Sequence, residues 1–258
     1  MVYCRNLNLY MLKKERHAFI IKQINLHNKV LSADLAIALN VSEDTIRRDL
    51  VELDESRQIV KVHGGALAKS FHYPFQHNDV YALDAKKTIA KKAISLIKSG
   101  MMVLTGGGST VLEMVQALPL DLSVTIFTIS PLVALQLADH PLVTVILIGG
   151  EFSKDSQVCV GSQVVSYLNE IKFDICFLGT NGISVNDGVT DSDLNIVHLK
   201  KAMIHASEQL VIMCIAEKLN SVQRMNVCQL NQVSYLITDL APADDALVNY
   251  LKKGVQLY

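Results

Sequence analysis

Two short stretches of this sequence hold side chains suited to binding phosphate groups. In 42–48, the hydroxyls of Ser42 and Thr45 precede two adjacent guanidinium groups, Arg47 and Arg48. In 105–110, three glycines precede two further hydroxyls. Guanidinium groups bind phosphates and guanine edges, and a glycine-rich turn before a helix directs backbone N–H groups at an anion. The two stretches therefore predict two separate binding sites.

The first stretch predicts an amphipathic helix. Ser42 is a good N-cap, and the next two residues are acidic, which the helix dipole favours in a first turn. Ile46, Leu50 and Leu53 follow at spacings of four and three residues, so they form one apolar stripe. Arg48 points away from that stripe. The helix therefore has one face for the core and an outer face with threonine and arginine.

The neighbouring segments predict a winged helix-turn-helix. An upstream helix over 13–29 carries isoleucines on one face, and a second helix starts at Ser32, an expected N-cap. A very short break at Asn40–Val41 separates this second helix from the basic one. Downstream, a β-type run over 59–62 ends in Gly64-Gly65, which is typical of a hairpin wing.

This order of elements favours DNA binding over an ordinary surface helix whose arginines are solvated or paired with Glu52 and Glu55. Double-stranded DNA is the expected partner. The helix side chains would meet phosphates or guanine edges, and the wing would touch the backbone or minor groove. The candidate DNA-contact residues are Ser32, Ser42, Thr45, Arg47, Arg48, Lys61 and His63.

The pieces "LSADLAIALNVSEDTIRRDL" and "VKVHGGA" resemble the DNA-binding half of the DeoR-type family of bacterial transcriptional regulators. The markers "TIRRDL" and "HGGA" are specific to that family. The resemblance implies a winged helix-turn-helix whose second helix enters the major groove. It also implies a homo-oligomer, a dimer or a tetramer, and hence a two-fold operator.

Length and composition suit two domains without a membrane segment. The chain has 258 residues, half of them apolar, and no apolar run reaches the roughly 20 residues that span a bilayer. We expect a DNA-binding domain over 11–69, a linker over 70–83 that contains Pro74, and an α/β domain over 84–258. No export signal precedes the first helix, so we expect the cytoplasm, and Met11 is an expected alternative start.

The cysteines and the charge distribution support the prediction of a cytoplasmic protein with a DNA-binding domain. The five cysteines are scattered, which argues against disulfides or a zinc site, and Cys176 and Cys214 lie in apolar runs typical of a core. No cofactor or metal is expected. Residues 1–70 carry eleven Lys and Arg against eight Asp and Glu, a net of +3, while the remainder carries −4. This asymmetry fits a DNA-binding head on a sensor body.

The second part of the chain predicts an α/β domain with a mostly parallel sheet. A helix capped by Asp84 opens it, and short runs that are apolar on both faces then alternate with helical patterns, as buried parallel strands do. In such sheets, ligands bind beyond the carboxyl ends of the strands.

Those strand ends hold the candidate effector residues. After the run "MMVLT", the loop and the first turn of the next helix form an anion nest, although a plain tight turn is the alternative. "FLGTNGI" and "IAEKLNS" add an amide and a lysine at other strand ends; for the lysine, an ordinary surface position is the alternative. The candidates are Gly107, Gly108, Ser109, Thr110, Asn181 and Lys218.

The segments "GGGSTVLEM", "LIGGEF", "FLGTNGIS", "GVTDSD" and "YLITD" also resemble the sensor domain of the same family, which is similar in fold to ribose-5-phosphate isomerases. The resemblance implies a phosphorylated sugar or related metabolite, with its phosphate on the glycine loop and with Asn181 and Lys218 nearby. Two departures affect the effector: Thr105 and Ala216-Glu217 stand where family members commonly carry an acidic residue.

The expected function is a repressor of sugar-catabolism genes that the metabolite releases from DNA. Two alternatives remain open. One is a sugar-phosphate isomerase with an added DNA-binding domain, but no acidic pair lies at "LGTNGI", so we expect no enzyme and no catalytic residue. The other is a constitutive DNA-binding protein whose body serves only for oligomerisation.

Overall fold

The computed structural model describes residues 11–27, 29–69 and 80–258. They fall into two compact units that divide between Tyr81 and Ala82. The alternative start at Met11 concerns residues 1–10, which lie outside the described part of the chain. Most of the expected linker, 70–79, also lies outside it, so the expected domain boundaries stay predictions.

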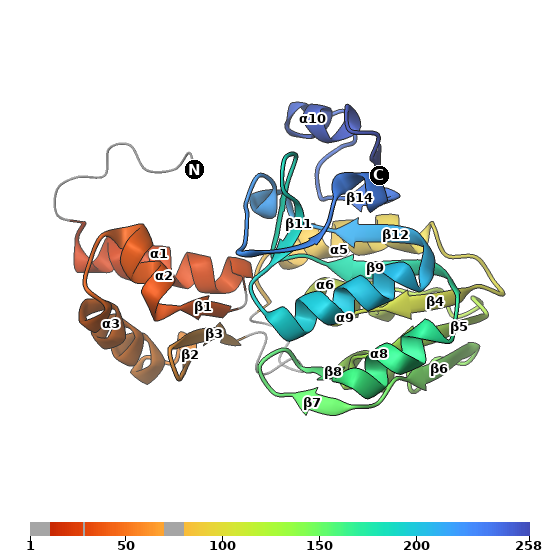
Figure 1. The fold of residues 1–258 in the computed structure, drawn as a ribbon, viewed down its shortest axis with the longest axis horizontal. Helices are drawn as coiled ribbons and strands as arrows, with labels where there is room; N and C mark the ends of the chain where they lie inside the picture. The colour runs from red at the N-terminus through yellow and green to blue at the C-terminus, as the bar shows by residue number, and fades with distance from the viewer. Residues whose placement is uncertain (1–10, 28, 70–79) are drawn as a thin grey trace. The chain divides into compact units, whose positions relative to one another are not determined.

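The first unit is a winged helix-turn-helix (Figure 1). Its three strands form an antiparallel sheet in the order β1-β3-β2. The apolar stripe predicted for the basic helix is buried against the first helix, through Ile46, Leu50 and Leu53 against Ile20 and Ile24. The elements are α1 (Lys13–His27), β1 (Lys29–Leu31), α2 (Ser32–Leu39), α3 (Glu43–Glu55), β2 (Ile59–Val62) and β3 (Gly65–Ala68).

The turn between α2 and α3 is built on a left-handed residue. Asn40 has φ 52°, and its N–H bonds back to the carbonyls of Ala36 and Ile37. Asparagine tolerates this conformation better than most side chains, so the helix ends there without glycine. Ser42 caps α3, as predicted. The predicted N-cap at Ser32 is wrong: Ser32 is the first residue inside α2, and Leu31 occupies the cap position.

The second unit is built on a seven-stranded parallel sheet with the order β15-β14-β12-β9-β4-β5-β6. The apolar runs of the sequence supply these strands because both faces of the sheet are covered. The strands are β4 (Met102–Thr105), β5 (Val124–Thr128), β6 (Val143–Leu147), β9 (Phe173–Gly179), β12 (Ser207–Met213), β14 (Tyr235–Ile237) and β15 (Gln256–Leu257).

Helices cover both faces of this sheet. In Figure 1, α5 and α6 lie side by side on one face, and α8 and α9 lie side by side on the other. The helices are α5 (Leu83–Ile94), α6 (Ser109–Gln116), α7 (Pro131–Gln136), α8 (Ser162–Asn169), α9 (Leu194–His205) and α10 (Val248–Leu251). The predicted cap at Asp84 is wrong, because α5 already starts at Leu83 and Ala82 occupies the cap position.

The strand order reverses between β4 and β9. From β4, the chain adds β5 and then β6 toward one edge, and β9, β12, β14 and β15 toward the other. Two successive crossovers that leave in opposite directions open a crevice at the carboxyl ends of the two central strands. This is where the glycine loop follows β4 and the Thr180-Asn181 segment follows β9.

Two small antiparallel pieces accompany the large sheet and were not predicted. One is the hairpin of β7 (Glu151–Ser153) and β8 (Val158–Val160). The other is a sheet of β10 (Gly182–Ser184), β11 (Gly188–Asp191) and β13 (Met225–Cys228). Three short 3-10 helices complete the unit, η2 (Ala216–Lys218), η3 (Leu230–Gln232) and η4 (Asp245–Leu247).

The core of the second unit contains the cysteines that the sequence assigned to it. Cys176 and Cys214 are buried, and burial raises the pKa of both thiols to about 12, so they stay protonated. Within residues 11–27, 29–69 and 80–258, no helix is long and apolar enough to cross a membrane. The same residues contain no cluster of His, Cys, Asp or Glu side chains that could hold a metal ion.

Candidate DNA interface and effector site

The outer face of α3 presents both arginines to solvent. The side chain of Arg48 is 76% exposed, and its guanidinium pairs with Asp44 at 2.5 Å. Arg47 is similarly exposed and lies 4.0 Å from Glu43. The partners are thus one turn earlier in the helix, not Glu52 and Glu55 as in the alternative from the sequence. Exposed pairs of this kind are worth only about 0.3–0.5 kcal/mol, so DNA can displace them.

The two hydroxyl groups at the start of α3, those of Ser42 and Thr45, are hydrogen-bonded to each other. The N–H of Thr45 donates to Ser42 Oγ over 3.2 Å, and the two hydroxyl oxygens lie 2.9 Å apart. This cap orders the first turn, so Thr45 and the arginines share one preorganised face. Ser32 does not belong to that face: its side chain is 5% exposed, which argues against a contact with DNA.

The wing is a hairpin with a two-residue tip. Val62 pairs with Gly65, which leaves His63 and Gly64 in the turn, and Gly64 has the positive φ of 75° that such turns require. Lys61 and His63 are exposed. The backbone N–H of Lys61 donates to Asp54 Oδ1 over 3.0 Å, so the wing is tied to the end of α3.

A buried carboxylate holds α3 against α1, and sequence reasoning missed it. Asp49 is 2% exposed. It accepts two hydrogen bonds from Arg16, at 2.5 and 2.9 Å, and lies 3.0 Å from His17 Nε2. Burial acts to raise the pKa of Asp49, but the bonds from Arg16 and His17 outweigh it, so the pKa lies below its usual value. The sequence did not indicate that Asp49 is buried, because its partners Arg16 and His17 lie in another helix.

The glycine loop after β4 approaches its neighbours closely. The N–H of Gly106 bonds to the carbonyl of Phe177 on β9, over 3.1 Å. A Cβ on Gly107 would lie 2.6 Å from Val158, and Gly108 has φ +102°, which side chains rarely adopt. Helix α6 starts immediately afterwards, and its first two residues are Ser109 and Thr110, both half-buried. Backbone N–H groups at this helix start are suited to an anion.

Two lysines that are far apart in the sequence of the second unit interact with each other near the carboxyl end of the sheet. Lys218, in η2, donates to the carbonyl of Thr180 over 3.0 Å, which places it beside the end of β9. Lys86, on the first turn of α5, is only 7% exposed and interacts electrostatically with Lys218 and with Glu113 of α6. Sequence reasoning missed Lys86, because the groups that act on it, Lys218 and Glu113, are distant in the sequence.

Burial is the main cause of the unusual basicity of these lysines. It lowers the pKa of Lys86 to about 7, with a further decrease from Lys218, while Glu113 opposes the shift. It also lowers the pKa of Lys218 to about 8. Two neighbouring ammonium groups repel each other, and perturbed groups of this kind gather at functional sites.

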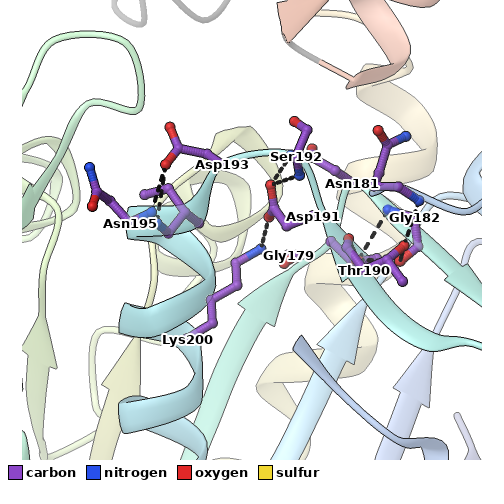
Figure 2. Close-up of polar contacts among 12 residues, drawn as sticks. Gly179, Asn181, Gly182, Thr190, Asp191, Ser192, Asp193, Asn195 and Lys200 are labelled. Carbon is purple, nitrogen blue, oxygen red and sulfur yellow. Dashed lines mark hydrogen bonds and ion pairs between the residues drawn. The ribbon is translucent and has the colours of Figure 1, made fainter. Parts of the chain in front are cut away.

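A third lysine forms a buried ion pair at the ends of β9 and β11. Asp191 is 1% exposed, and Lys200 of α9 donates to it over 2.8 Å and to the carbonyl of Gly179 over 2.9 Å. Asn181 donates its Nδ2 to Asp191 over 2.9 Å. Figure 2 shows Lys200 reaching from the helix toward Asp191, with Asn181 and Ser192 around the same carboxylate. Neither Asp191 nor Lys200 is among the candidate residues from the sequence.

The predicted residues therefore gather at adjacent strand ends. Pairing of Thr105 with Phe177 sets the glycine loop beside the segment that leads to Asn181. Two carboxylates from other elements act on the lysines, Glu113 on Lys86 and Asp191 on Lys218. At the positions where family members commonly carry an acidic residue, Thr105 is buried in the sheet and Glu217 is exposed. The joint contact of the loop hydroxyls and Lys218 with an effector stays a prediction.

A winged helix-turn-helix joined to a doubly wound α/β unit defines a class of DNA-binding regulators with a sensor domain. Comparison with known families identifies the class more closely. Residues 16–71 match the DeoR-like helix-turn-helix domain, and residues 82–240 match the DeoR C terminal sensor domain. The chain belongs to the DeoR family of transcriptional regulators, as the sequence resemblance implied.

The relatives that match this chain over nearly their whole length are named as transcriptional regulators or repressors. The chain is 31% identical to the HTH-type transcriptional regulator GolR of Listeria innocua, over 87% of this chain and 90% of the relative. It is 30% identical to the HTH-type transcriptional repressor GlcR of Bacillus subtilis, over 96% of both chains. A lactose phosphotransferase system repressor of Staphylococcus epidermidis is 29% identical, over 89% and 93%. These relatives are named as regulators or repressors and not as enzymes.

Among solved structures, the chain has a likeness to ribose 5-phosphate isomerase A from Methanocaldococcus jannaschii. The identity is 19%, the coverage is 53% of this chain and 54% of the other, and the TM-score is 0.40.

Proposed function

We propose that the protein is a repressor of sugar-catabolism genes that leaves its operator when a phosphorylated sugar, or a related metabolite, binds at the strand ends. The observation that carries the proposal is a pair of lysines, the buried Lys86 and the half-buried Lys218, which interact near the ends of the central strands, where the glycine loop and the start of α6 also lie. The relatives named as a repressor and as a lactose phosphotransferase system repressor support the same direction of control.

The phosphate would bind to Gly107, Gly108, Ser109 and Thr110, with Lys218 as a cation. A phosphate carries close to two negative charges at neutral pH. It would therefore stabilise the charged forms of two lysines whose pKa values burial has lowered.

On the DNA side, six residues are proposed to contact the operator. Arg47 and Arg48 would read guanine edges or phosphates in the major groove, with Thr45 beside them and Ser42 near the backbone. Lys61 and His63 of the wing would touch the backbone or the minor groove. We propose a homo-oligomer, a dimer or a tetramer, because two heads on a two-fold operator supply the affinity that a chain of low net charge needs.

The first experiment is a thermal-shift screen of the full chain with phosphorylated sugars, their non-phosphorylated parents and inorganic phosphate. We expect stabilisation by at least one phosphorylated compound and not by its parent. The same compound should weaken operator binding about 5- to 150-fold, the usual scale of allosteric coupling. Lys218→Met should abolish the shift, and Lys201→Met, an exposed lysine of α9, is the matched control.

Two outcomes would contradict the proposal. A shift that survives Lys218→Met and replacement of Ser109 and Thr110 by bulky residues would place the ligand elsewhere. A panel with no shift at all would leave a constitutive DNA-binding protein whose second unit serves only for oligomerisation.

A further inference from the structure

The outward face of α3 carries one apolar side chain among polar ones. Asp44, Arg47, Arg48 and Val51 follow one another at spacings of three, one and three residues, so they line one side of the helix. Val51 is 39% exposed, whereas the other three apolar residues of α3 are buried. It is therefore the one apolar side chain that α3 presents to solvent.

A different side of α3 is turned toward α1. Glu52 pairs with Lys13 of α1 at 2.6 Å, and Asp49 accepts hydrogen bonds from Arg16 of the same helix. Successive residues of a helix are about 100° apart, so Glu52 and Asp49 point well away from Val51. Val51 and the two arginines thus lie on the side of α3 that α1 leaves exposed.

The stability of α3 does not explain a valine at this position. A β-branched side chain loses rotamer freedom in a helix, so valine is a weaker helix former than alanine, glutamate or lysine. Val51 is also not part of the core of the first unit. Single exposed apolar residues are common, so exposure alone indicates no function. The informative feature is that Val51 shares its face with both arginines.

This arrangement matches how a recognition helix reads bases. A homeodomain helix contacts the major groove through four residues that also have spacings of three, one and three. In the major groove, thymine presents a 5-methyl group, and apolar side chains contact it. Valine has no hydrogen-bond donor or acceptor, so the methyl group is the feature of a base edge that suits Val51.

We infer that Val51 is a specificity residue of the DNA interface and contacts the 5-methyl group of a thymine in each half-site, next to the groups that Arg47 and Arg48 contact. The inference rests on the proposed function, because it requires α3 to enter the major groove. Arginines select guanine or bind phosphate, and neither contact distinguishes thymine from cytosine. Val51 supplies that distinction at its own position.

The test removes the methyl group from the DNA and the apolar contact from the protein. Duplexes selected from random DNA by the full-length wild-type protein are remade with deoxyuridine at one thymine position at a time, in both half-sites. This change deletes the 5-methyl group and keeps the base pair. We expect one position at which wild-type binding weakens about 4-fold for each half-site, the value of one buried methyl group.

The variant Val51→Ala should no longer respond at that position. The same replacement by deoxyuridine should change its affinity by less than about 2-fold, because the contact is already lost. Alanine is the better helix former, so the variant keeps its fold. Leu120→Ala is the matched control: it shortens an exposed apolar side chain of the second unit and should keep the wild-type response.

The outcomes separate this inference from the function on which it rests. If the wild-type protein selects a sequence but no thymine position responds to deoxyuridine, the inference is wrong while DNA binding stands. The same holds if Val51→Ala keeps the wild-type response, or loses affinity equally on every duplex. If the wild-type protein selects no sequence at all, the proposed DNA-binding function fails and the inference fails with it.

Discussion

Arg48 projects from the middle of α3 with most of its side chain in solvent, where it pairs with Asp44. Arg48→Ala should weaken binding to the preferred sequence by about 1–3 kcal/mol if the guanidinium reads a base edge. Binding to unrelated sequences should change much less. The measurement is a pair of salt titrations on selected and random duplexes, with Lys14→Ala on α1 as the control. An equal loss on both duplexes would mean that Arg48 contacts phosphate.

Lys86 and Lys218 give the effector site a pH dependence of known sign. Without ligand, burial sets their pKa values at about 7 and about 8, so above pH 8 both lose protons that a bound phosphate would restore. Binding at pH 8.5 should therefore take up between about one and two protons, and affinity should fall from pH 7 to pH 9. Calorimetry in two buffers of different ionisation enthalpy measures the uptake.

The control for this prediction compares the buried Lys86 with its exposed neighbour Lys87 on α5. Lys86→Met should reduce the proton uptake, whereas Lys87→Met, an exposed lysine, should leave it unchanged. Uptake that is the same in all three proteins would show that other groups bind the proton.

At the scale of elements, α3 depends on a partner in α1. Asp49→Ala removes the acceptor of Arg16 and His17, and should lower the free energy of unfolding of the first unit by about 1.5–3 kcal/mol. Because the folded pKa of Asp49 is lowered, its stabilisation is present above its ordinary pKa of 3.8 and is lost as the pH falls through the folded value. Urea denaturation at pH 7 and pH 3 should show a smaller difference between wild type and variant at the lower pH.

The glycine loop is the second element whose geometry decides function. Gly108→Ala places a Cβ at φ +102°, which costs about 1–3 kcal/mol in strain or moves the N–H groups at the start of α6. The thermal shift with phosphorylated ligands should be lost. Gly149→Ala is the matched control, since a Cβ there meets nothing within 4 Å and its φ is ordinary. An unchanged shift in Gly108→Ala would remove the loop from the site.

At the scale of the whole molecule, the charge of the chain limits how it binds DNA. Residues 1–70 carry a net charge of +3 and the remainder −4, so one head has little non-specific attraction for DNA. We expect a dimer or larger in sedimentation experiments. Selection from random DNA should give two-fold related half-sites about 34–36 Å apart, or a multiple of that distance. A monomer on a single half-site would contradict this arrangement.

The sequence by itself determined the parts that depend on neighbours along the chain. The Ser42 cap, the stripe of Ile46, Leu50 and Leu53, and the short turn at Asn40 are all local, so periodicity and capping predicted the DNA-binding unit. The apolar runs predicted most strands of the parallel sheet for the same reason, because burial on both faces leaves a continuous pattern. The cap predictions at Ser32 and Asp84 were wrong, because both helices begin earlier than the capping pattern indicates. Ser32 and Asp84 therefore lie inside their helices.

Only the tertiary structure decided which distant residues meet. Lys218 lowers the pKa of Lys86, Asp49 binds Arg16, and Asp191 binds both Asn181 and Lys200. These contacts depend on the order of strands and on the reversal between β4 and β9. Local periodicity shows that a segment is a strand or a helix but carries no information on its neighbour in space. The burial of Glu113 and Asp191 among lysines therefore follows from the tertiary structure and not from any local pattern in the sequence.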